Sequence, residues 1–198
     1  MHDTDGKKWI VSLEWETREG YEKPGAICLV EYSPQTRSVV GYPQRIWRGG
    51  TDRGCIEAPH LTRRGDYYYL MVAEGGTGYG HAVTMARATQ VAGPYEGDPQ
   101  NPIVTSWPEN FNARHDADHL KPHYFNPQTY LQKAGHGSYV ETPTGEVWLT
   151  HLCSRPFRQA LRCPLGRETA IQKMVWSDDG WLRMAAGAVS YTHLRAHE

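Results

Sequence analysis

Several features that mark other classes of protein are scarce in this chain of 198 residues. It has only four cysteines, with no CxxC pair and no small-secreted-domain spacing, so we expect reduced thiols. Residues 1–20 are polar and charged and do not resemble a signal peptide, which favours a cytoplasmic protein. The longest apolar run is far too short to span a membrane. The formal net charge is −1 and the pI about 6.8, so we expect neither a nucleic acid nor a membrane as partner.

Aromatic side chains are unevenly chosen. There are seven Trp and twelve Tyr but only three Phe. Aromatic rings with a polar edge suit half-hydrated strands, and they suit sugar-binding clefts, where a ring face packs on C–H groups. Ordinary packing in a β-rich core is the alternative interpretation of any one of these residues.

The pattern of turns and apolar residues predicts an all-β protein. No stretch keeps a helical period, and turn signals recur every 10–15 residues. Pro43 interrupts one predicted strand, which suits an edge or a bend. A short extended segment begins at Glu57, and the predicted strands are 7–15, 25–33, 39–47, 67–73, 81–88, 147–153 and two within 168–184.

Three segments repeat one plan, a glycine turn that leads into an aromatic–aliphatic strand. They begin at Asp5, Arg64 and Thr144. Repetition of a unit of several strands at this period indicates the blades of a β-propeller. Three blades do not close a ring and would leave exposed edges, so we expect the chain to be a fragment or to continue elsewhere.

Two stretches fall outside this plan. Residues 98–130 form a proline-rich loop, and its part from 107 to 130 contains His115, Asp116, Asp118, His119 and His123. Alternating His and Asp residues could bind a metal, but their spacing fits no known site and solvated loop polarity is the preferred interpretation. Residues 189–198 resemble a read-through tail rather than a frayed strand. The predicted organisation is therefore a propeller domain over 1–188 and a non-native tail over 189–198.

Glu57 is the first candidate for chemistry. It lies two residues before Pro59 and just ahead of a predicted buried strand. Partial burial raises the pKa of a carboxyl group, which is what a general acid needs near neutral pH. A capping or surface glutamate is the alternative.

Five strings carry a resemblance to a known family. They are Ile56-Glu57-Ala58-Pro59-His60-Leu61, and the stretches over 65–70, 73–83, 132–142 and 165–172. Together they resemble glycoside hydrolase family 43, in its β-xylosidase and α-L-arabinofuranosidase members. The resemblance implies a five-bladed propeller, of which this chain would hold about three blades. It also implies an inverting hydrolase that binds the non-reducing end of a xylan-derived oligosaccharide, with two carboxyl groups roughly 6.5–9.5 Å apart.

The resemblance assigns roles to particular residues. Glu57 matches the general acid, Arg167 the arginine that binds the terminal sugar, His136 the histidine at the bottom of the site, and Thr77 a residue of the pocket wall. The corresponding histidine in parts of the family lies beside a central calcium, so a structural calcium near His136 is compatible with the resemblance, while no cofactor is required. The alternatives are a surface ion pair for Arg167, a core histidine for His136 and a turn residue for Thr77.

Some parts of the family pattern have no match here. No residue corresponds to the catalytic base, and the aspartate that tunes the acid's pKa would fall ahead of Met1. Asp3 and Asp5 lie in the wrong register to replace it. The C-terminal β-sandwich domain of the xylosidase-like members is absent as well.

We therefore expect a hydrolase fragment that is inactive alone and whose full-length protein releases terminal xylose or arabinose. Any oligomer would form through that full-length protein. A carbohydrate-binding propeller without catalysis is the alternative, and a protein-interaction propeller is a third interpretation.

Overall fold

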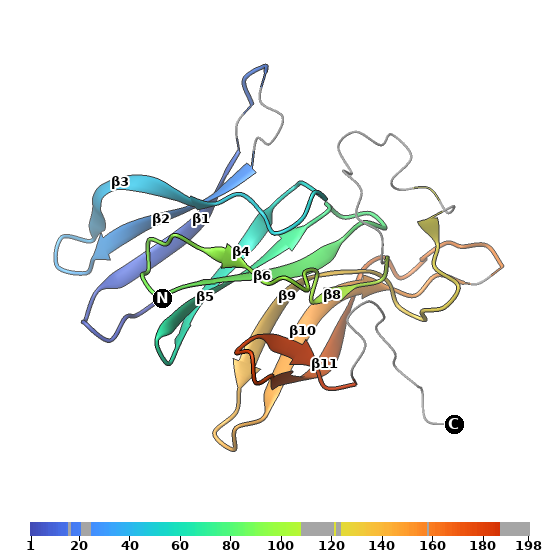
Figure 1. Cartoon of the computed structure of the whole chain (residues 1–198). Helices are drawn as coiled ribbons and strands as arrows, with labels where there is room; N and C mark the ends of the chain where they lie inside the picture. The colour runs from blue at the N-terminus through green and yellow to red at the C-terminus, as the bar shows by residue number, and fades with distance from the viewer. Residues whose placement is uncertain (16, 21–24, 108–120, 122–123, 158, 187–198) are drawn as a thin grey trace.

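The computed structural model describes residues 1–15, 17–20, 25–107, 121, 124–157 and 159–186 (Figure 1). Within these ranges the protein is all-β and contains no α-helix. Its strands are β1 (Lys8–Trp15), β2 (Gly25–Ser33), β3 (Ser38–Trp47), β4 (Glu57–Arg64), β5 (Tyr67–Glu74), β6 (Ala82–Ala88), β7 (Glu96–Gly97), β8 (Val104–Thr105), β9 (Gln132–Glu141), β10 (Val147–Ser154), β11 (Glu168–Trp176) and β12 (Leu182–Met184).

The strands form three antiparallel sheets. The first sheet has the order β1-β2-β3, the central sheet β4-β5-β6-β7 with β8 paired to β6, and the third sheet β9-β10-β11-β12. The predicted glycine turns lead into equivalent strands, because β1, β5 and β10 each follow one. His2 forms a β-bridge with Lys8 of β1. This bridge occupies the position beside β1 that β4 occupies beside β5. Each copy of the internal sequence repeat therefore corresponds to one antiparallel sheet.

The central sheet is packed on both faces. Successive side chains of a strand point to opposite faces. Leu70 and Val72 of β5 accordingly join a cluster with Ile27 of the first sheet. Tyr69 and Met71 join a second cluster with Leu149 and Met174 of the third sheet. Side chains from β5 therefore bind the three sheets into one stack.

The outer sheets are buried on one face. In β11 buried and exposed residues alternate, as a half-buried strand requires. β3 is exposed over most of its length and contains Pro43, so the prediction of an edge strand is confirmed. Exposed aliphatic residues are Val39 and Val40 on the edge strand β3, and Ile171 and Val175 on the outer face of β11.

The predicted strands agree with the observed ones except at a few places. The short strands β7 and β8 were not predicted, and β8 lies within the predicted loop 98–130. The extended segment at Glu57 is a full strand of eight residues, β4. The third sheet begins at Gln132, inside a stretch that the sequence did not assign to a strand. The His and Asp residues between 115 and 119, His123 and the tail 189–198 lie outside the described residues. In the part of the chain that is described, the four cysteines form no disulfide. In the part of the chain that is described, no helix is long and apolar enough to cross a membrane.

Candidate active site

Glu57 is the first residue of β4. Its backbone pairs with Ala73, and a bulge then follows before His60. Ala58 in that bulge has a φ of 50°, a left-handed conformation that non-glycine residues seldom adopt. The Glu57 side chain is half-buried, and within the described ranges its carboxylate takes part in no hydrogen bond or ion pair. The structure thus leaves this carboxyl group open to a ligand.

Arg167 lies close enough to Glu57 to interact with it electrostatically, although the two residues are far apart in the sequence. It precedes β11, directly after Gly166, whose φ is 72°. Burial lowers the pKa of the Arg167 guanidinium, while Cys153 and the carboxylate of Glu57 act in the opposite direction. The Arg167 Nη2 atom is 3.0 Å from His81 Nδ1, and Nη1 donates a long hydrogen bond of 3.4 Å to the Thr77 carbonyl. The central and third sheets therefore bring an acid and a guanidinium together.

Thr77 contributes its backbone to this arrangement. Its side chain is exposed, in the turn that follows Gly75 and Gly76. The contact with Arg167 is made by the carbonyl oxygen. A role for this hydroxyl in a pocket wall stays a prediction.

His136 lies on β9 between two glycines that the packing requires. A Cβ atom at Gly135 would lie 2.4 Å from Cγ of His81, and one at Gly137 would lie 2.9 Å from a methyl group of Val83. The His136 ring is 6.4 Å from the His81 ring, centroid to centroid, and its backbone has a φ of 54°. Burial and the neighbouring His136 lower the pKa of His60. The Gly-His-Gly string thus seats His136 beside two other imidazoles.

Unusual backbone conformations concentrate around these residues. Six non-glycine residues of the described part have a positive φ, and four of them are Cys55, Ala58, Lys133 and His136. Such conformations cost about 1–3 kcal/mol each and persist where the surrounding structure imposes them. The packing of β4 and β9 therefore imposes a particular backbone geometry beside Glu57 and His136.

A buried network that the sequence did not reveal anchors the loop before Glu57. The Glu74 carboxylate accepts hydrogen bonds from Gly50 N at 2.6 Å, from Thr51 N at 3.1 Å, and from the hydroxyls of Thr51 and Thr84 at 2.6 Å each. Arg53 is fully buried and donates to the carbonyls of Gly80 at 2.8 Å and Trp107 at 2.6 Å. Burial lowers the pKa of Arg53 to about 10, against the opposing charge of Glu74. The sequence hint to this network was Glu74, which stands directly before the double glycine Gly75-Gly76.

Side chains around His136 include imidazoles rather than the oxygen ligands that calcium prefers, and a structural calcium there stays a prediction. Calcium takes six to eight oxygen ligands. The side chains that surround His136 include the imidazoles of His60 and His81. In the described part, no group of three or more His, Cys, Asp or Glu residues converges on a point that could hold a metal.

Asp3 is far from Glu57. Its carboxylate accepts hydrogen bonds from the Tyr68 hydroxyl at 2.8 Å and from Arg63 at 2.9 Å. Arg63 follows Glu57 by six residues along β4, which is about 20 Å of extended chain. Asp3 therefore stabilises the opposite end of the central sheet.

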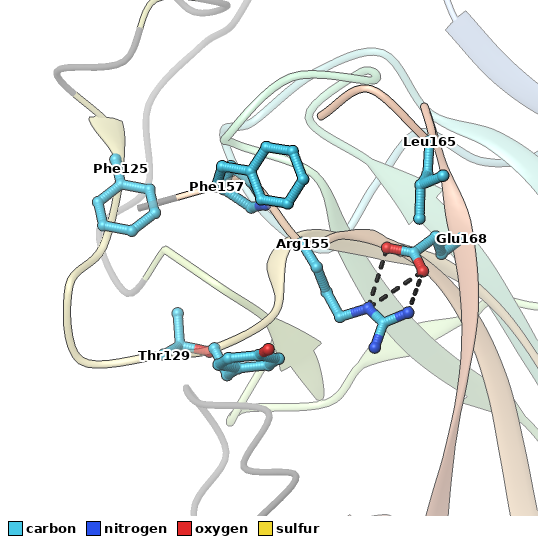
Figure 2. Close-up of a pocket in the computed structure, with 8 residues that line it drawn as sticks. Phe125, Thr129, Arg155, Phe157, Leu165 and Glu168 are labelled. Carbon is cyan, nitrogen blue, oxygen red and sulfur yellow. Dashed lines mark hydrogen bonds and ion pairs between the residues drawn. The ribbon is translucent and has the colours of Figure 1, made fainter. Parts of the chain in front are cut away.

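A cavity of about 400 Å³ opens near the start of β11, outside this group of residues. Phe125, Phe157 and Leu165 line it, together with Arg155 and Glu168 (Figure 2). Arg155 Nε is 3.0 Å from both carboxylate oxygens of Glu168, and Arg155 Nη2 also donates to Oε1, so the pair is bidentate. None of the four predicted site residues lines this cavity.

Comparison with known proteins identifies the family. Residues 1–182 match the family model described as Glycosyl hydrolases family 43. The chain belongs to this family. A family 43 assignment agrees with the strings around Glu57, His136 and Arg167 that the sequence analysis singled out.

Curated relatives in family 43 are much longer than this chain. It is 45% identical to a "Beta-xylosidase" of Bacillus subtilis (strain 168), over 94% of this chain and 33% of the relative. It is also 45% identical to "Xylosidase/arabinosidase 43B" of Humicola insolens, over 96% of this chain and 32% of the relative. The chain spans about a third of the length of the curated relatives it matches.

Solved structures of family 43 proteins share the fold. A xylan beta-1,4-xylosidase from Bacillus halodurans C-125 superimposes with a TM-score of 0.82 at 45% identity, over 98% of this chain and 33% of that one. GH43B of Bacteroides ovatus gives a TM-score of 0.72 at 30% identity, over 94% of this chain and 31% of that one. These neighbours are β-propellers, and the three antiparallel sheets of this chain agree with that architecture.

Proposed function

We propose that this chain is part of an inverting glycoside hydrolase that releases terminal xylose or arabinose from xylan-derived oligosaccharides. The observation that carries the proposal is the carboxyl group of Glu57, half-buried and beside the guanidinium of Arg167. The complete enzyme would be a five-bladed propeller, to which this chain contributes three sheets. The family match and the names of the relatives support the reaction class.

Glu57 acts as the general acid in this proposal. Its protonated carboxyl gives a proton to the glycosidic oxygen while the bond from that oxygen to the anomeric carbon breaks. A water molecule attacks the anomeric carbon from the opposite face and loses its proton to a second carboxylate, roughly 6.5–9.5 Å from the first. No residue of this chain matches that base, so a segment outside residues 1–198 supplies it.

Arg167 binds the terminal sugar. Its guanidinium has only donors, which suit the hydroxyl oxygens of a sugar. His136 and Thr77 line the same pocket. Because these groups contact the sugar rather than the leaving group, they serve a xyloside and an arabinofuranoside alike.

Turnover of chromogenic substrates tests the proposal. The full-length protein that contains this chain should hydrolyse an aryl β-xyloside, an aryl α-arabinofuranoside or both, whereas residues 1–198 alone should hydrolyse neither. Turnover by residues 1–198 alone would refute the claim that this chain lacks the catalytic base. Oligosaccharide binding without any turnover by the full-length protein would instead favour a carbohydrate-binding propeller.

A second experiment tests the role of Glu57. Glu57→Gln in the full-length protein should lower kcat/KM by about 10²–10⁴-fold on substrates with poor leaving groups. An activated aryl leaving group needs little protonation, so its hydrolysis should fall far less. Glu141→Gln is the matched control, because Glu141 is exposed on β9 and pairs with Arg64 at 3.6 Å. Equal losses on both substrates would argue against an acid role.

A further inference from the structure

His81 is a buried histidine that contacts Arg167. It lies directly before β6 and is 1% exposed. Two groups face its Nδ1 atom: the Arg167 Nη2 atom at 3.0 Å and the carbonyl oxygen of Lys133 at 3.2 Å. Its Nε2 atom is buried and, within the part of the chain described, has no hydrogen-bond partner. The imidazole therefore interacts with its polar neighbours through Nδ1.

The imidazole is neutral in the folded protein. Burial and the positive charge of Arg167 together lower the pKa of His81 to about 3. A neutral imidazole carries one proton, so Nδ1 is either a donor or an acceptor. A guanidinium can only donate, and a bond from a charged donor is stronger than one between neutral groups. The shorter contact, with Arg167, therefore favours a lone pair on Nδ1 and the proton on Nε2.

The backbone of β9 keeps the imidazole in place. A Cβ atom at Gly135 would lie 2.4 to 2.6 Å from three atoms of the ring, so the main chain at this glycine packs directly against His81. The hydrogen bond that the Arg167 guanidinium donates to the Thr77 carbonyl is long, at 3.4 Å. His81 is thus the firmer of these two supports. The buried Nε–H of Arg167 has no hydrogen-bond partner among the described residues.

We propose that His81 is a positioning residue for Arg167, in which Nδ1 accepts one N–H of the guanidinium and directs the remaining donors toward the terminal sugar. This inference rests on the sugar-binding role proposed for Arg167. It assigns to His81 neither a proton transfer nor a contact with the substrate. Its loss should weaken sugar binding more than it slows the chemical step.

Two substitutions at position 81 separate the hydrogen bond from the volume of the side chain. His81→Asn keeps an acceptor near the place of Nδ1, whereas His81→Leu has a similar volume and no acceptor. In the full-length protein, His81→Leu should raise KM by about tenfold or more while kcat changes by less than about threefold. His81→Asn should restore most of the lost affinity. An unchanged KM in folded His81→Leu, or equal KM values for the Asn and Leu variants, would overturn the proposal.

His151 provides the matched control. It is buried, and its Nε2 atom also lacks a partner in the described residues, but its Nδ1 faces the carbonyl of Leu152 at 3.0 Å instead of an arginine. His151→Leu should lower stability as His81→Leu does without raising KM. A KM increase of the same size in both variants would show a general effect of emptying the core.

A stability measurement tests the contact without any catalysis. The single variants His81→Leu and Arg167→Met and the double variant form a cycle, in which the unfolding constants are compared. If Nδ1 accepts from Arg167, the effects should be non-additive by at least about threefold. Additive effects would disprove the contact even if turnover is normal. A coupled pair in a protein that lacks glycosidase activity would instead refute the proposed function.

Discussion

The central sheet and the first sheet are built from the same strand pattern, but their surroundings differ. β5 is buried along nearly its whole length, whereas β3 is exposed along most of its own. Side chains of the central sheet pack against both neighbours. All the proposed site residues belong to the central and third sheets, and none belongs to the first. The site therefore forms where two sheets pack closely, with its backbone conformations fixed from both sides.

A cavity at the packed interface should have the largest effect on stability. Met71 on β5 is fully buried between the central and third sheets. Met71→Ala should lower the free energy of unfolding by about 2–5 kcal/mol. Val175→Ala on β11, where the side chain is 45% exposed, should cost less than about 1 kcal/mol. Urea denaturation measures both, and similar losses would contradict the contrast between packed and open faces.

Removing the charge of Glu74 should have the next largest effect. Glu74→Gln keeps the shape but replaces an acceptor oxygen with an amide donor that faces other donors, the backbone N–H of Gly50 and the hydroxyl of Thr84 among them. We expect a loss of about 1.5–3 kcal/mol in the free energy of unfolding. Glu31→Gln breaks the exposed ion pair with Lys7 on the first sheet and should have a much smaller effect. Equal losses for Glu74→Gln and Glu31→Gln in urea denaturation would contradict the view that Glu74 anchors the loop before Glu57.

A methyl group at Gly135 should disturb stability and the site together. Gly135→Ala places a Cβ against the His81 ring and should cost about 1–3 kcal/mol. Gly145→Ala has open space around its Cβ but a φ of 80°, so it should cost about 1 kcal/mol. Thermal unfolding compares the two, and substrate kinetics adds the sharper distinction. KM should rise for Gly135→Ala and stay unchanged for Gly145→Ala. A rise in both variants would show that the effect on KM does not act through His81.

A lower pH should have the smallest of these effects on the free energy of unfolding. The folded-state pKa of His81 is about 3, well below the usual 6.5, because burial and Arg167 disfavour the charged form. The unfolded chain therefore binds the proton first as the pH falls, and stability decreases from pH 6.5 toward pH 3. His81 alone should cost about 1 kcal/mol between pH 6.5 and 5.5, and burial of His60 and His151 acts in the same direction.

Hydrogen exchange at both pH values locates this loss. Protection should fall in β6, β9 and β10 before it falls in β1 and β2. Uniform loss of protection across the three sheets would place the acid-sensitive groups elsewhere.

The strands and their repetition could be predicted because each sheet carries its own local signal. The turns at Gly65 and Gly145 and the alternation in β11 are visible in the sequence without knowledge of the packing. Glu57 and Arg167, by contrast, are 110 positions apart (167 minus 57), and only the family strings linked them.

Other features of the site depend on tertiary contacts. The lowered pKa of His81 follows from burial and from the arginine beside it. Ala58 and His136 have a left-handed backbone, although their residue types do not predict that conformation. The carbonyl of Thr77 contacts Arg167, although the sequence directed attention to its side chain.

The anchored loop 49–56 has a mechanical consequence. It is the covalent link between β3 of the first sheet and β4, which begins with Glu57. Because Thr51 is tied to Glu74, Arg53 to Gly80 and Gly54 to Gly75, the loop is fastened to the central sheet before the chain reaches Glu57. The backbone that leads into Glu57 is therefore held by the central sheet, after the exposed strand β3 has ended.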